Sequence, residues 1–581
     1  MERATQDRYR LWSTDPFFDD ATRAELLSIA GQEDEIEERF YKDLEFGTGG
    51  LRGILGAGLN RMNVYTVAKA SEGFARYLLS EGEPFYKRGV AISYDSRLHS
   101  SDFALVTALV FATHGIPAFL SDELRPTPML SFAVRRFGAA AGVMITASHN
   151  PAKYNGYKAY GEDGGQLPPE AADKVLDAIR SIDDIRTLRW TGRADAEAKG
   201  LLRLFGRELD DAYMAALEPL SIDRGAISRQ AGMKIVYTPL HGAGNKPVRR
   251  ILDELGFRNV LVVPEQEMPD SAFPTVAFPN PEERSALQLA IDLAGRESAD
   301  LVIATDPDGD RMGIALREPD GAYSVLSGNQ IGLLLMEYVL SARKAAGTLP
   351  PGSFCVTTIV STQLADTIGR AYGVEVLRTL TGFKFIGEKI KELDENGTMH
   401  FQFGFEESFG YLCGTDVRDK DAVVASMLFA ELAASSRDAG SSVRARLRSL
   451  NERFGFAAED TVSITLEGRE GVERIAGVMT RMRADKDGDL GGVPVLAIDD
   501  YLTLTRTVCA EKTVPIEGFT PSDVLRYRLS GDDWFCVRPS GTEPKIKIYF
   551  GCYGPVEAEC RVRLTALKET VVGLIRDRLA Q

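Results

Sequence analysis

Short apolar runs and longer stretches suited to helices alternate along most of this chain. Between residues 88 and 150, the apolar runs are Val90–Tyr94, Ala118–Leu120 and Gly142–Thr146, and a segment suited to a helix separates each run from the next. Strands and helices that alternate in this way form βαβ units, which build a mostly parallel sheet. The same rhythm returns after residue 230 and again after residue 328. We therefore expect three consecutive α/β blocks.

The length of the chain requires more than one domain. A chain of 581 residues is too long for one hydrophobic core and suggests roughly three to five domains. The last block differs from the others, because two strands, Trp534–Val537 and Lys545–Phe550, bracket a polar turn before a closing helix. We predict α/β domains over residues 1–220, 221–327 and 328–455, with mixed, mostly parallel sheets. A smaller C-terminal α+β domain is predicted over residues 456–581.

Composition and charge narrow the class of protein. The chain is 44% hydrophobic and 26% charged, as in ordinary globular proteins, and its net charge of −16 argues against binding nucleic acid or an anionic membrane surface. The first twenty residues lack an apolar signal core, and no apolar run approaches the ~20 residues of a membrane span. The six cysteines form no C-x-x-C pair, which favours a reducing compartment. We expect a cytoplasmic protein without a nucleic-acid or membrane partner.

A first polar loop follows the predicted strand Gly142–Thr146. It contains Ser148 among small and polar residues, so we expect the serine hydroxyl to be exposed. Serine attacks poorly unless a neighbour accepts its proton or neutralises incoming charge, which His149 or Lys158 could do. No G-x-S-x-G elbow is present, so a hydrolase triad is not indicated. A loop serine beside a turn-capping histidine is the competing interpretation, and the Ser-His pair alone favours it.

A second polar loop follows the short apolar strand Leu301–Ala304. Its carboxylates Asp306, Asp308 and Asp310 alternate with Pro and Gly, an arrangement that suits a hard divalent cation. An EF-hand is excluded because arginines replace both the required glycine and the bidentate glutamate. A solvated acidic turn remains possible, but the position after a buried strand, beside an arginine, favours a metal site.

Two further loops suit a sugar phosphate. Residues 404–410, Gly-Phe-Glu-Glu-Ser-Phe-Gly, offer acidic and hydroxyl groups for sugar hydroxyls, and the charged run 418–421 follows them. Residues 538–545, Arg-Pro-Ser-Gly-Thr-Glu-Pro-Lys, combine an arginine fork with hydroxyls and backbone amides, which suits an anion. A strand-linking turn and a solvated charged face are the simpler interpretations of these two regions.

Six motifs in this order resemble those of the α-D-phosphohexomutase family, which includes phosphoglucomutases and phosphomannomutases. The motifs cover residues 50–53 (Gly-Leu-Arg-Gly), 146–151, 306–311, 381–384 (Thr-Gly-Phe-Lys), 404–410 and 538–545. The chain also carries Phe-Gly-Thr-Gly-Gly at 46–50 and Asp-Glu-Leu-Arg-Pro-Thr-Pro at 122–128, which resemble the longer phosphoglucomutases. That branch of the family also contains phosphopentomutases.

The resemblance implies a four-domain enzyme around a central cleft, with Ser148 as the phosphoserine. Magnesium would be held by Asp306, Asp308 and Asp310, with a phosphoryl oxygen on Ser148 as a further ligand. The residues implied around the transferred phosphoryl group, or in proton transfer, are Arg52, His149, Lys158, Arg311 and Lys420. The residues implied at the sugar are Thr381, Gly382, Lys384, Glu406 and Ser408. The residues implied at the phosphate that does not react are Arg538, Ser540, Gly541, Thr542 and Lys545.

The reaction implied is that of a phosphoglucomutase, which interconverts glucose 1-phosphate and glucose 6-phosphate. A phosphoserine enzyme would give and regain a phosphate, with glucose 1,6-bisphosphate as intermediate and activator and Mg²⁺ as cofactor. This scheme has a physical basis, because phosphoryl transfer needs a cation on the developing charge and an aligned hydroxyl. A single reaction centre can serve both ends of a sugar if a separate site anchors the distal phosphate.

Several alternatives share these motifs. A phosphopentomutase acting on ribose or deoxyribose 1-phosphate is the main one, because the motifs do not decide the ring size. A phosphomannomutase, a sugar 1,6-bisphosphate synthase and a phosphatase are less favoured. A non-catalytic paralogue that binds sugar phosphates would be expected to have lost the serine or a metal carboxylate, and this chain retains both.

Overall fold

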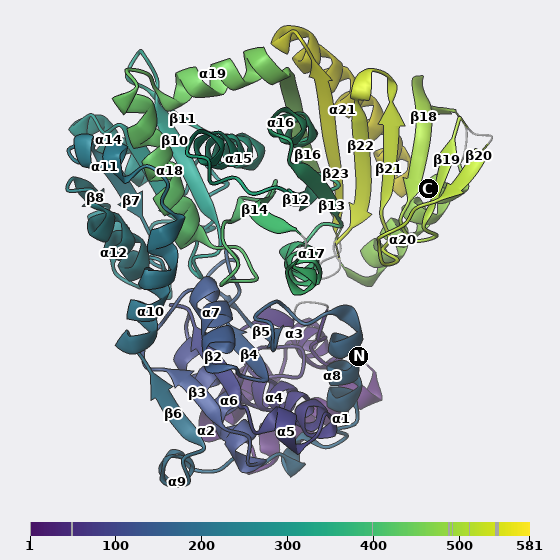
Figure 1. Ribbon diagram of the computed structural model, residues 1–581. Coiled ribbons are helices and arrows are strands. Elements are labelled where there is room, and N and C mark those ends of the chain that lie inside the picture. The colour runs from purple at the N-terminus through teal and green to yellow at the C-terminus, as the bar shows by residue number, and fades with distance from the viewer. Residues whose placement is uncertain are drawn as a thin grey trace. The chain divides into compact units, whose positions relative to one another are not determined.

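The computed structural model describes residues 2–47, 50–397, 399–466, 468–485, 488–490, 492–509, 512–540 and 545–580. The chain divides into two compact units (Figure 1). The first unit comprises Met1–Ser353 and Phe383–Val443, and the second comprises Phe354–Gly382 and Arg444–Gln581.

The first sheet has the strand order β1-β5-β4-β2-β3-β6. Its strands are β1 (Leu51–Ile54), β2 (Val90–Tyr94), β3 (Ala118–Ser121), β4 (Ala141–Ile145), β5 (Tyr154–Gly161) and β6 (Leu202–Phe205). Strand β2 pairs in parallel with β3 and β4, whereas β5 is antiparallel to β4 and β1. The βαβ rhythm therefore predicted the parallel centre of this sheet correctly. Strand β2 matches its expected run, β3 ends one residue later than expected, and β4 is shifted one residue earlier.

Helices cover this sheet. Helices α6 (Ser100–Thr113) and α7 (Thr127–Phe137) pack against β2 and β4, while α4 (Val64–Ser80) packs against α6 and α8 (Pro169–Arg180). The remaining helices of this part are α1 (Arg3–Thr14), α2 (Asp20–Ser28), α3 (Glu33–Phe40), α5 (Glu83–Tyr86), α9 (Arg193–Ala198) and α10 (Arg207–Leu217). Single-turn 3₁₀ helices lie at Ile185–Thr187 and Glu218–Leu220.

The second sheet has the order β11-β10-β9-β7-β8. Its strands are β7 (Ile235–Thr238), β8 (Val260–Val262), β9 (Leu301–Thr305), β10 (Met312–Arg317) and β11 (Tyr323–Val325). Strand β7 is parallel to β8 and β9, and β9 turns back into β10 as an antiparallel pair. The helices of this part are α11 (Arg224–Arg229), α12 (Asn245–Leu255), α13 (Pro264–Glu267) and α14 (Gln288–Glu297). The turn between β9 and β10 is the predicted acidic loop.

A largely buried helix, α18 (Ala422–Asp438), belongs to the first unit. Fourteen of its seventeen residues are buried, as expected for a helix that is apolar on all sides. It packs against α11, α12, α15 (Gly328–Ala345) and β15 (Gly410–Leu412). Strand β15 is antiparallel to β14 (His400–Glu406), and helix α17 (Phe383–Asn396) packs on β14. Because α18 is held by this packing, the charged residues 418–421 directly before it have a fixed position.

The second unit contains an antiparallel sheet with the order β16-β23-β22-β21-β18-β19-β20, in which β17 also pairs with β18. Its strands are β16 (Phe456–Thr465), β17 (Asp489–Leu490), β18 (Val493–Asp500), β19 (Thr505–Val508), β20 (Lys512–Pro515), β21 (Leu525–Leu529), β22 (Trp534–Pro539) and β23 (Lys545–Gly554). Its helices are α19 (Val443–Phe454, which begins in the first unit), α20 (Gly468–Ala484), α21 (Glu557–Ala580) and a 3₁₀ turn at Ser530–Asp532. The same unit holds the parallel pair β12 (Ser353–Thr358, with its first residue in the first unit) and β13 (Glu375–Thr379), together with α16 (Leu364–Tyr372).

The predicted architecture of α/β blocks followed by a smaller antiparallel α+β part is confirmed. The domain boundaries at residues 220, 327 and 455 stay predictions.

Candidate functional site: a serine loop over a buried carboxylate turn

The serine loop leaves the carboxyl end of β4 in a fixed conformation. Ser148 has a positive φ of 53°, and its N–H donates to Thr146 Oγ1 over 2.8 Å. The Thr146 hydroxyl in turn donates to Asp95 Oδ2 over 2.6 Å. The expected exposure of the Ser148 hydroxyl is wrong, because the residue is only 3% exposed. The loop turns the serine inward, toward the acidic turn of the second sheet.

The side chain of Arg97 fixes the backbone of this loop by hydrogen bonds. Its guanidinium donates to the carbonyl oxygens of Ser148 and Asn150, and over 3.0 Å to each of those of Pro151 and Tyr154. The guanidinium Nε lies 3.3 Å from Asp95 Oδ2, and both side chains are fully buried. Four backbone acceptors of one loop therefore depend on a single side chain.

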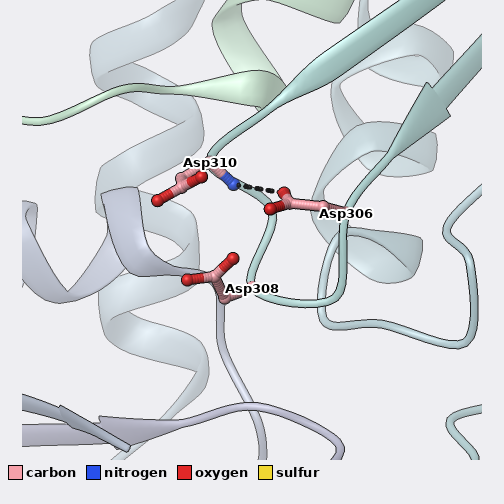
Figure 2. A group of neighbouring side chains, drawn as sticks. All are labelled: Asp306, Asp308 and Asp310. Carbon is pink, nitrogen blue, oxygen red and sulfur yellow. Dashed lines mark hydrogen bonds between the residues drawn. The ribbon is translucent and has the colours of Figure 1, made fainter. Parts of the chain in front are cut away.

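The acidic turn connects β9 to β10 and is organised by its own first carboxylate. Asp306 Oδ1 accepts the backbone N–H groups of Asp310 (3.1 Å) and Arg311 (2.9 Å), and Figure 2 shows the first of these bonds. One carboxylate oxygen from each of Asp306, Asp308 and Asp310 lies within 4.8 Å of the others. Figure 2 shows the three side chains gathered around the turn. All three are almost completely buried.

Two lysines balance this buried negative charge. Lys158 Nζ, from β5, donates to Asp308 Oδ2 (2.8 Å) and Asp310 Oδ2 (3.2 Å), and Lys420 Nζ lies 3.3 Å from Asp310 Oδ2. Burial opposes the charged form of Lys158, but the two carboxylates outweigh it and raise the pKa of this ammonium. The same pairing, against the effect of burial, holds the pKa of the Asp308 carboxyl well below its usual range. Both lysines therefore stay charged across the neutral range.

The carboxylate turn also has unused ligand atoms. Asp308 Oδ1 and Asp310 Oδ1 are buried and have no hydrogen-bond partner among the described residues. Buried oxygens of this kind are costly unless something compensates them, and carboxylate oxygens are the ligands that Mg²⁺ prefers. Among the described residues, these three aspartates are the only group of three or more ligating side chains close enough to share an ion. The residues present therefore fit a divalent cation.

The serine hydroxyl contacts both the carboxylate turn and a histidine. Ser148 Oγ donates to Asp306 Oδ2 over 3.0 Å, and His149 Nδ1 lies 3.3 Å from Ser148 Oγ. Burial lowers the pKa of the His149 imidazole well below its usual value, and the positive charges of Arg311 and Arg52 lower it further. A neutral imidazole can accept a proton, so the hydroxyl has two acceptors within reach.

Two arginines flank the serine loop. Arg52, from β1, donates to Asn150 Oδ1 over 3.0 Å. Arg311 follows the carboxylate turn and forms an ion pair with Glu282. The Nε atom of Arg311 is buried and has no hydrogen-bond partner among the described residues. A cationic donor of this kind suits a phosphoryl oxygen.

The sugar motif at residues 404–410 adjoins the acidic turn. Met312 N–H donates to the carbonyl oxygen of Phe409 over 3.1 Å, and Arg311 pairs with Gly410 in an isolated β-bridge. Burial raises the pKa of the Glu406 carboxyl to about 7, although the Lys420 ammonium lowers it. Ser408 lies in the turn after Glu406 and is half-buried.

The charged run at residues 418–421 is not a solvated face. Each of its four residues is less than 7% exposed. Asp419 Oδ2 accepts Tyr160 Oη (2.9 Å) and Gln166 Nε2 (3.0 Å), and Asp419 Oδ1 lies 3.0 Å from Lys420 Nζ. Asp421 caps α18 by accepting the N–H groups of its first turn. The buried contacts of this run therefore hold the Lys420 ammonium next to the acidic turn.

The other predicted site residues fall into different parts of the molecule. Lys384 is half-buried near the start of α17 in the first unit, with its Nζ 4.9 Å from the Phe385 ring centroid. Thr381 and Gly382 belong to the second unit. In that unit, Arg538 lies in β22 opposite Lys547, and Ser540 N–H donates to the carbonyl oxygen of Lys545 over 2.7 Å. Gly541 and Thr542 lie outside the described residues.

Arg97 and Glu282 contribute to the site but were not predicted. Arg97 could have been found by the rule that located the other loops, because Asp-Ser-Arg at 95–97 directly follows the strand Val90–Tyr94. Glu282 carries no such signal, since it lies in the irregular segment between α13 and α14 and reaches Arg311 only in the folded chain.

Comparison with known proteins identifies the family. Models of phosphoglucomutase/phosphomannomutase alpha/beta/alpha domains I, II and III match residues 43–186, 211–321 and 327–454. The chain belongs to the phosphoglucomutase/phosphomannomutase family. The predicted family and the enzyme class, a phosphosugar mutase, are confirmed.

Relatives within this family cover nearly the whole chain. A phosphoglucomutase of Staphylococcus aureus (strain USA300) is 37% identical over 520 residues, which is 89% of this chain and 91% of the relative. The phosphoglucomutase of strain MSSA476 is 36% identical over 532 residues, or 91% and 92% of the two chains. These relatives support the predicted phosphoglucomutase activity.

Solved structures of the family share the fold. The pp63/parafusin phosphoglucomutase of Paramecium superimposes with a TM-score of 0.67 at 16% identity, over 93% of this chain and 96% of that one. A phosphoglucomutase/phosphomannomutase family protein of Burkholderia thailandensis gives a TM-score of 0.64 at 18% identity, over 92% and 97%. At these identities the likeness concerns the fold.

No helix in the described part of the chain combines the length and the apolar character needed to cross a membrane. The cytoplasmic location and the absence of a nucleic-acid partner stay predictions.

Proposed function

We propose that this enzyme interconverts glucose 1-phosphate and glucose 6-phosphate, with Ser148 as the carrier of the phosphoryl group. The observation that carries the proposal is the 3.0 Å contact between Ser148 Oγ and Asp306, one of three buried carboxylates. Two oxygens of this group, on Asp308 and Asp310, have no hydrogen-bond partner among the described residues. The choice of glucose rests on the family relatives, which are phosphoglucomutases over about nine-tenths of this chain.

The proposed metal site consists of Asp306, Asp308 and Asp310, with a phosphoryl oxygen on Ser148 completing it. Mg²⁺ bound there would neutralise charge on the transferred phosphoryl group. The two unpartnered carboxylate oxygens, one on Asp308 and one on Asp310, support this assignment, because both are buried without a hydrogen-bond partner among the described residues. Lys158 also holds the pKa of the Asp308 carboxyl well below its usual range, so this side chain is ready to bind a cation.

The protein's own groups would align and neutralise the phosphoryl group. Arg52, Arg311, Lys158 and Lys420 place four positive charges around the serine and the acidic turn, and the buried Nε of Arg311 has no hydrogen-bond partner in the described part of the chain. Because the raised pKa values of Lys158 and Lys420 keep them protonated, they act as fixed charges. His149 is neutral, so its Nδ1 can take the Ser148 proton when the hydroxyl regains a phosphate.

The proposed cycle transfers phosphate twice. In the first transfer, the bond between phosphorus and Ser148 Oγ breaks, a bond to the free sugar hydroxyl forms, and that hydroxyl loses its proton to the enzyme. The product is glucose 1,6-bisphosphate. After the bisphosphate turns over, its other phosphate returns to Ser148 Oγ by the reverse chemistry.

The cycle needs contacts to the rest of the sugar phosphate. Glu406 and Ser408, with Thr381, Gly382 and Lys384, are proposed to bind the sugar. Arg538, Ser540, Gly541, Thr542 and Lys545 are proposed to hold the distal phosphate. The paired strands support this, because Arg538 is the penultimate residue of β22 and Lys545 is the first residue of β23.

Turnover of two substrates tests the proposal. Purified enzyme with Mg²⁺ and a trace of glucose 1,6-bisphosphate is given glucose 1-phosphate or ribose 1-phosphate, with Ser148→Ala as the control. We expect fast conversion of the glucose ester, loss of conversion in Ser148→Ala, and ³²P transfer from labelled bisphosphate to the parent enzyme only. A preference for ribose 1-phosphate would reassign the enzyme as a phosphopentomutase. Equal rates for the parent and Ser148→Ala would refute the role of the serine.

A further inference from the structure

A cavity in the first unit is lined by residues that have no assigned part in the reaction. It has a volume of about 600 Å³, within the range of small-molecule sites. Four stretches of chain form its walls: the segment from Glu123 to Met129, helix α10, residues 242–250 at the start of α12, and Met268 with Pro269. None of the predicted catalytic, metal or sugar residues lines it.

The interior of this cavity is apolar and adaptable. Met129 and Met214 are buried in its wall, whereas Met268 is 70% exposed at its edge. Methionine side chains are flexible and polarisable, so they fit ligands of varied shape. Pro126 and Pro247 add rigid apolar surface. The cavity therefore suits the apolar body of a small organic molecule.

The charged lining is mainly basic. Four lining residues are basic and two are acidic, in a chain whose net charge is −16. The buried Arg125 is neutralised by Asp210, with contacts of 2.6 and 3.0 Å, and Lys246 pairs with Glu123. The remaining two, Arg207 and Arg250, pair with acids outside the lining. Arg207 lies 3.8 Å from Asp211 in an exposed pair of the kind that contributes little, and the partly exposed Arg250 lies 2.7 Å from both Asp211 and Glu254. An anionic group of a ligand can replace Asp211 or Glu254 as the partner of these two arginines.

One wall of the cavity is also the support of the acidic turn. Thr127, which follows the lining residue Pro126, donates from its N–H to Asp308 O (2.8 Å) and from its hydroxyl to Asp308 Oδ2 (3.0 Å). The N–H of Ala243 donates to the carbonyl oxygen of Pro307 over 2.8 Å. Gly309 packs so closely on Pro126 that a Cβ there would lie 2.7 Å from the proline ring. A movement of this wall would therefore change the position of the Asp308 carboxylate.

We propose that this cavity is a regulatory site for an organic anion with an apolar body, and that its occupancy changes the affinity of the acidic turn for divalent cations. The apolar body would fill the methionine-lined interior, and the anionic group would lie against Arg207 and Arg250. The proposed coupling rests on the proposed metal site, whereas the binding of a ligand in the cavity does not. Because coupling is reciprocal, cation binding would change the affinity of the anion by the same factor.

The dye 8-anilinonaphthalene-1-sulfonate is a suitable probe, since it joins an apolar body to a sulfonate and fluoresces in apolar surroundings. The folded full-length protein is titrated with the dye in EDTA, with glucose 6-phosphate added to occupy the reaction centre. We expect saturable binding that weakens about tenfold or more in Arg207→Glu/Arg250→Glu and in Leu124→Trp, which narrows the cavity. Arg203→Glu/Arg258→Glu changes the net charge equally at exposed sites away from the cavity and should bind like the parent.

Two results would overturn the ligand assignment: absence of saturable binding to the parent, or equal binding by the Arg207→Glu/Arg250→Glu and control variants. The coupling is tested separately by titrating Mn²⁺ and following its electron paramagnetic resonance signal. We expect saturating dye to change the Mn²⁺ dissociation constant about threefold or more in the parent and not in Leu124→Trp. An unchanged constant with dye bound would refute the coupling.

The variant Asp306→Asn separates this proposal from the proposed function. It should lose Mn²⁺ binding and turnover but still bind the dye like the parent. If the parent failed to turn over glucose 1-phosphate yet bound the dye at this cavity, the regulatory ligand would stand and the proposed reaction would not.

Discussion

The guanidinium of Arg97 donates a hydrogen bond to the carbonyl oxygen of Ser148, the residue proposed to carry the phosphoryl group. Its other bonds reach three further carbonyl oxygens of the same loop, and Phe273 lies over the guanidinium with its ring centroid 5.0 Å away. The loop therefore owes its shape to a residue about fifty positions earlier in the chain. Arg97 touches no proposed reacting atom, so its role is positional.

Arg97→Lys is expected to lower kcat about 10²-fold while changing KM little. A lysine ammonium lacks the planar fork and leaves several buried carbonyls without donors, so the Ser148 hydroxyl loses its alignment. Steady-state kinetics and the rate of ³²P transfer to Ser148 check this. The exposed Arg88→Lys, which changes the same residue type outside the loop, should retain full activity. A parent-like transfer rate in Arg97→Lys would contradict the positioning role.

Asp306→Asn is expected to separate stability from metal binding. Three carboxylates within 4.8 Å repel one another when no cation is present, so removing one charge should raise the thermal unfolding temperature in EDTA or leave it unchanged. The asparagine oxygen can still accept the N–H groups of Asp310 and Arg311. The rise in unfolding temperature that Mg²⁺ produces in the parent should be absent.

Differential scanning fluorimetry with and without Mg²⁺ measures both effects of Asp306→Asn. Asp300→Asn, an aspartate outside the acidic turn, serves as the control and should keep the Mg²⁺-dependent rise. A parent-like response to Mg²⁺ in Asp306→Asn would argue against the metal site.

Gly410→Ala is expected to reduce activity by about 10- to 100-fold at a modest loss of stability. An added Cβ at Gly410 would lie 2.4 Å from Lys420 Cδ, and a flexible lysine side chain can move aside. Its ammonium would then leave Asp310, which it now contacts at 3.3 Å. Such a displacement of a charged group typically removes a few kcal/mol of transition-state stabilisation.

Turnover and unfolding temperature are measured together for Gly410→Ala. The matched control is Gly295→Ala in α14, where no atom lies within 4 Å of the added methyl group. Full activity in Gly410→Ala would mean that the position of Lys420 does not matter for turnover.

Asp421→Asn is expected to remove part of the pH dependence of stability. Burial raises the pKa of the Asp421 carboxyl from 3.8 to about 6 in the folded protein. Because the folded pKa lies above the unfolded value, ionisation destabilises the fold. This loss develops as pH rises from about 4 to about 6 and persists above that range.

The expected difference for Asp421→Asn is about 1–3 kcal/mol in favour of the variant at pH 8, and close to zero at pH 4. Asparagine can still cap α18, because its oxygen can accept the N–H groups of Val423 and Val424. Thermal unfolding of both proteins at pH 4, 6 and 8 tests this. A constant difference at all three pH values would show that the carboxyl does not titrate in this range.

Local sequence predicted the chemistry of individual loops well. The acidic turn follows β9 and the serine loop follows β4, as expected for polar residues at the carboxyl ends of strands in an α/β sheet. Strand and helix periodicity also predicted the parallel centre of the first two sheets. These signals can be read from the sequence because each lies within a few neighbouring residues. In the second unit, β16 and β18–β21 were not predicted. Several of their residues are exposed, so apolar runs do not mark them.

By itself, the sequence determined the family, the α/β architecture and the residue types that a phosphoserine and a divalent cation require. Only the tertiary structure decided that Ser148 is turned inward, that Arg97 fixes its loop, and that Lys420 meets Asp310. It also showed that the cavity beside Pro126 shares a wall with the acidic turn. These contacts join segments tens to hundreds of residues apart. Their geometry depends on the order of strands and the packing of α18, which the spacing of residues along the chain does not encode.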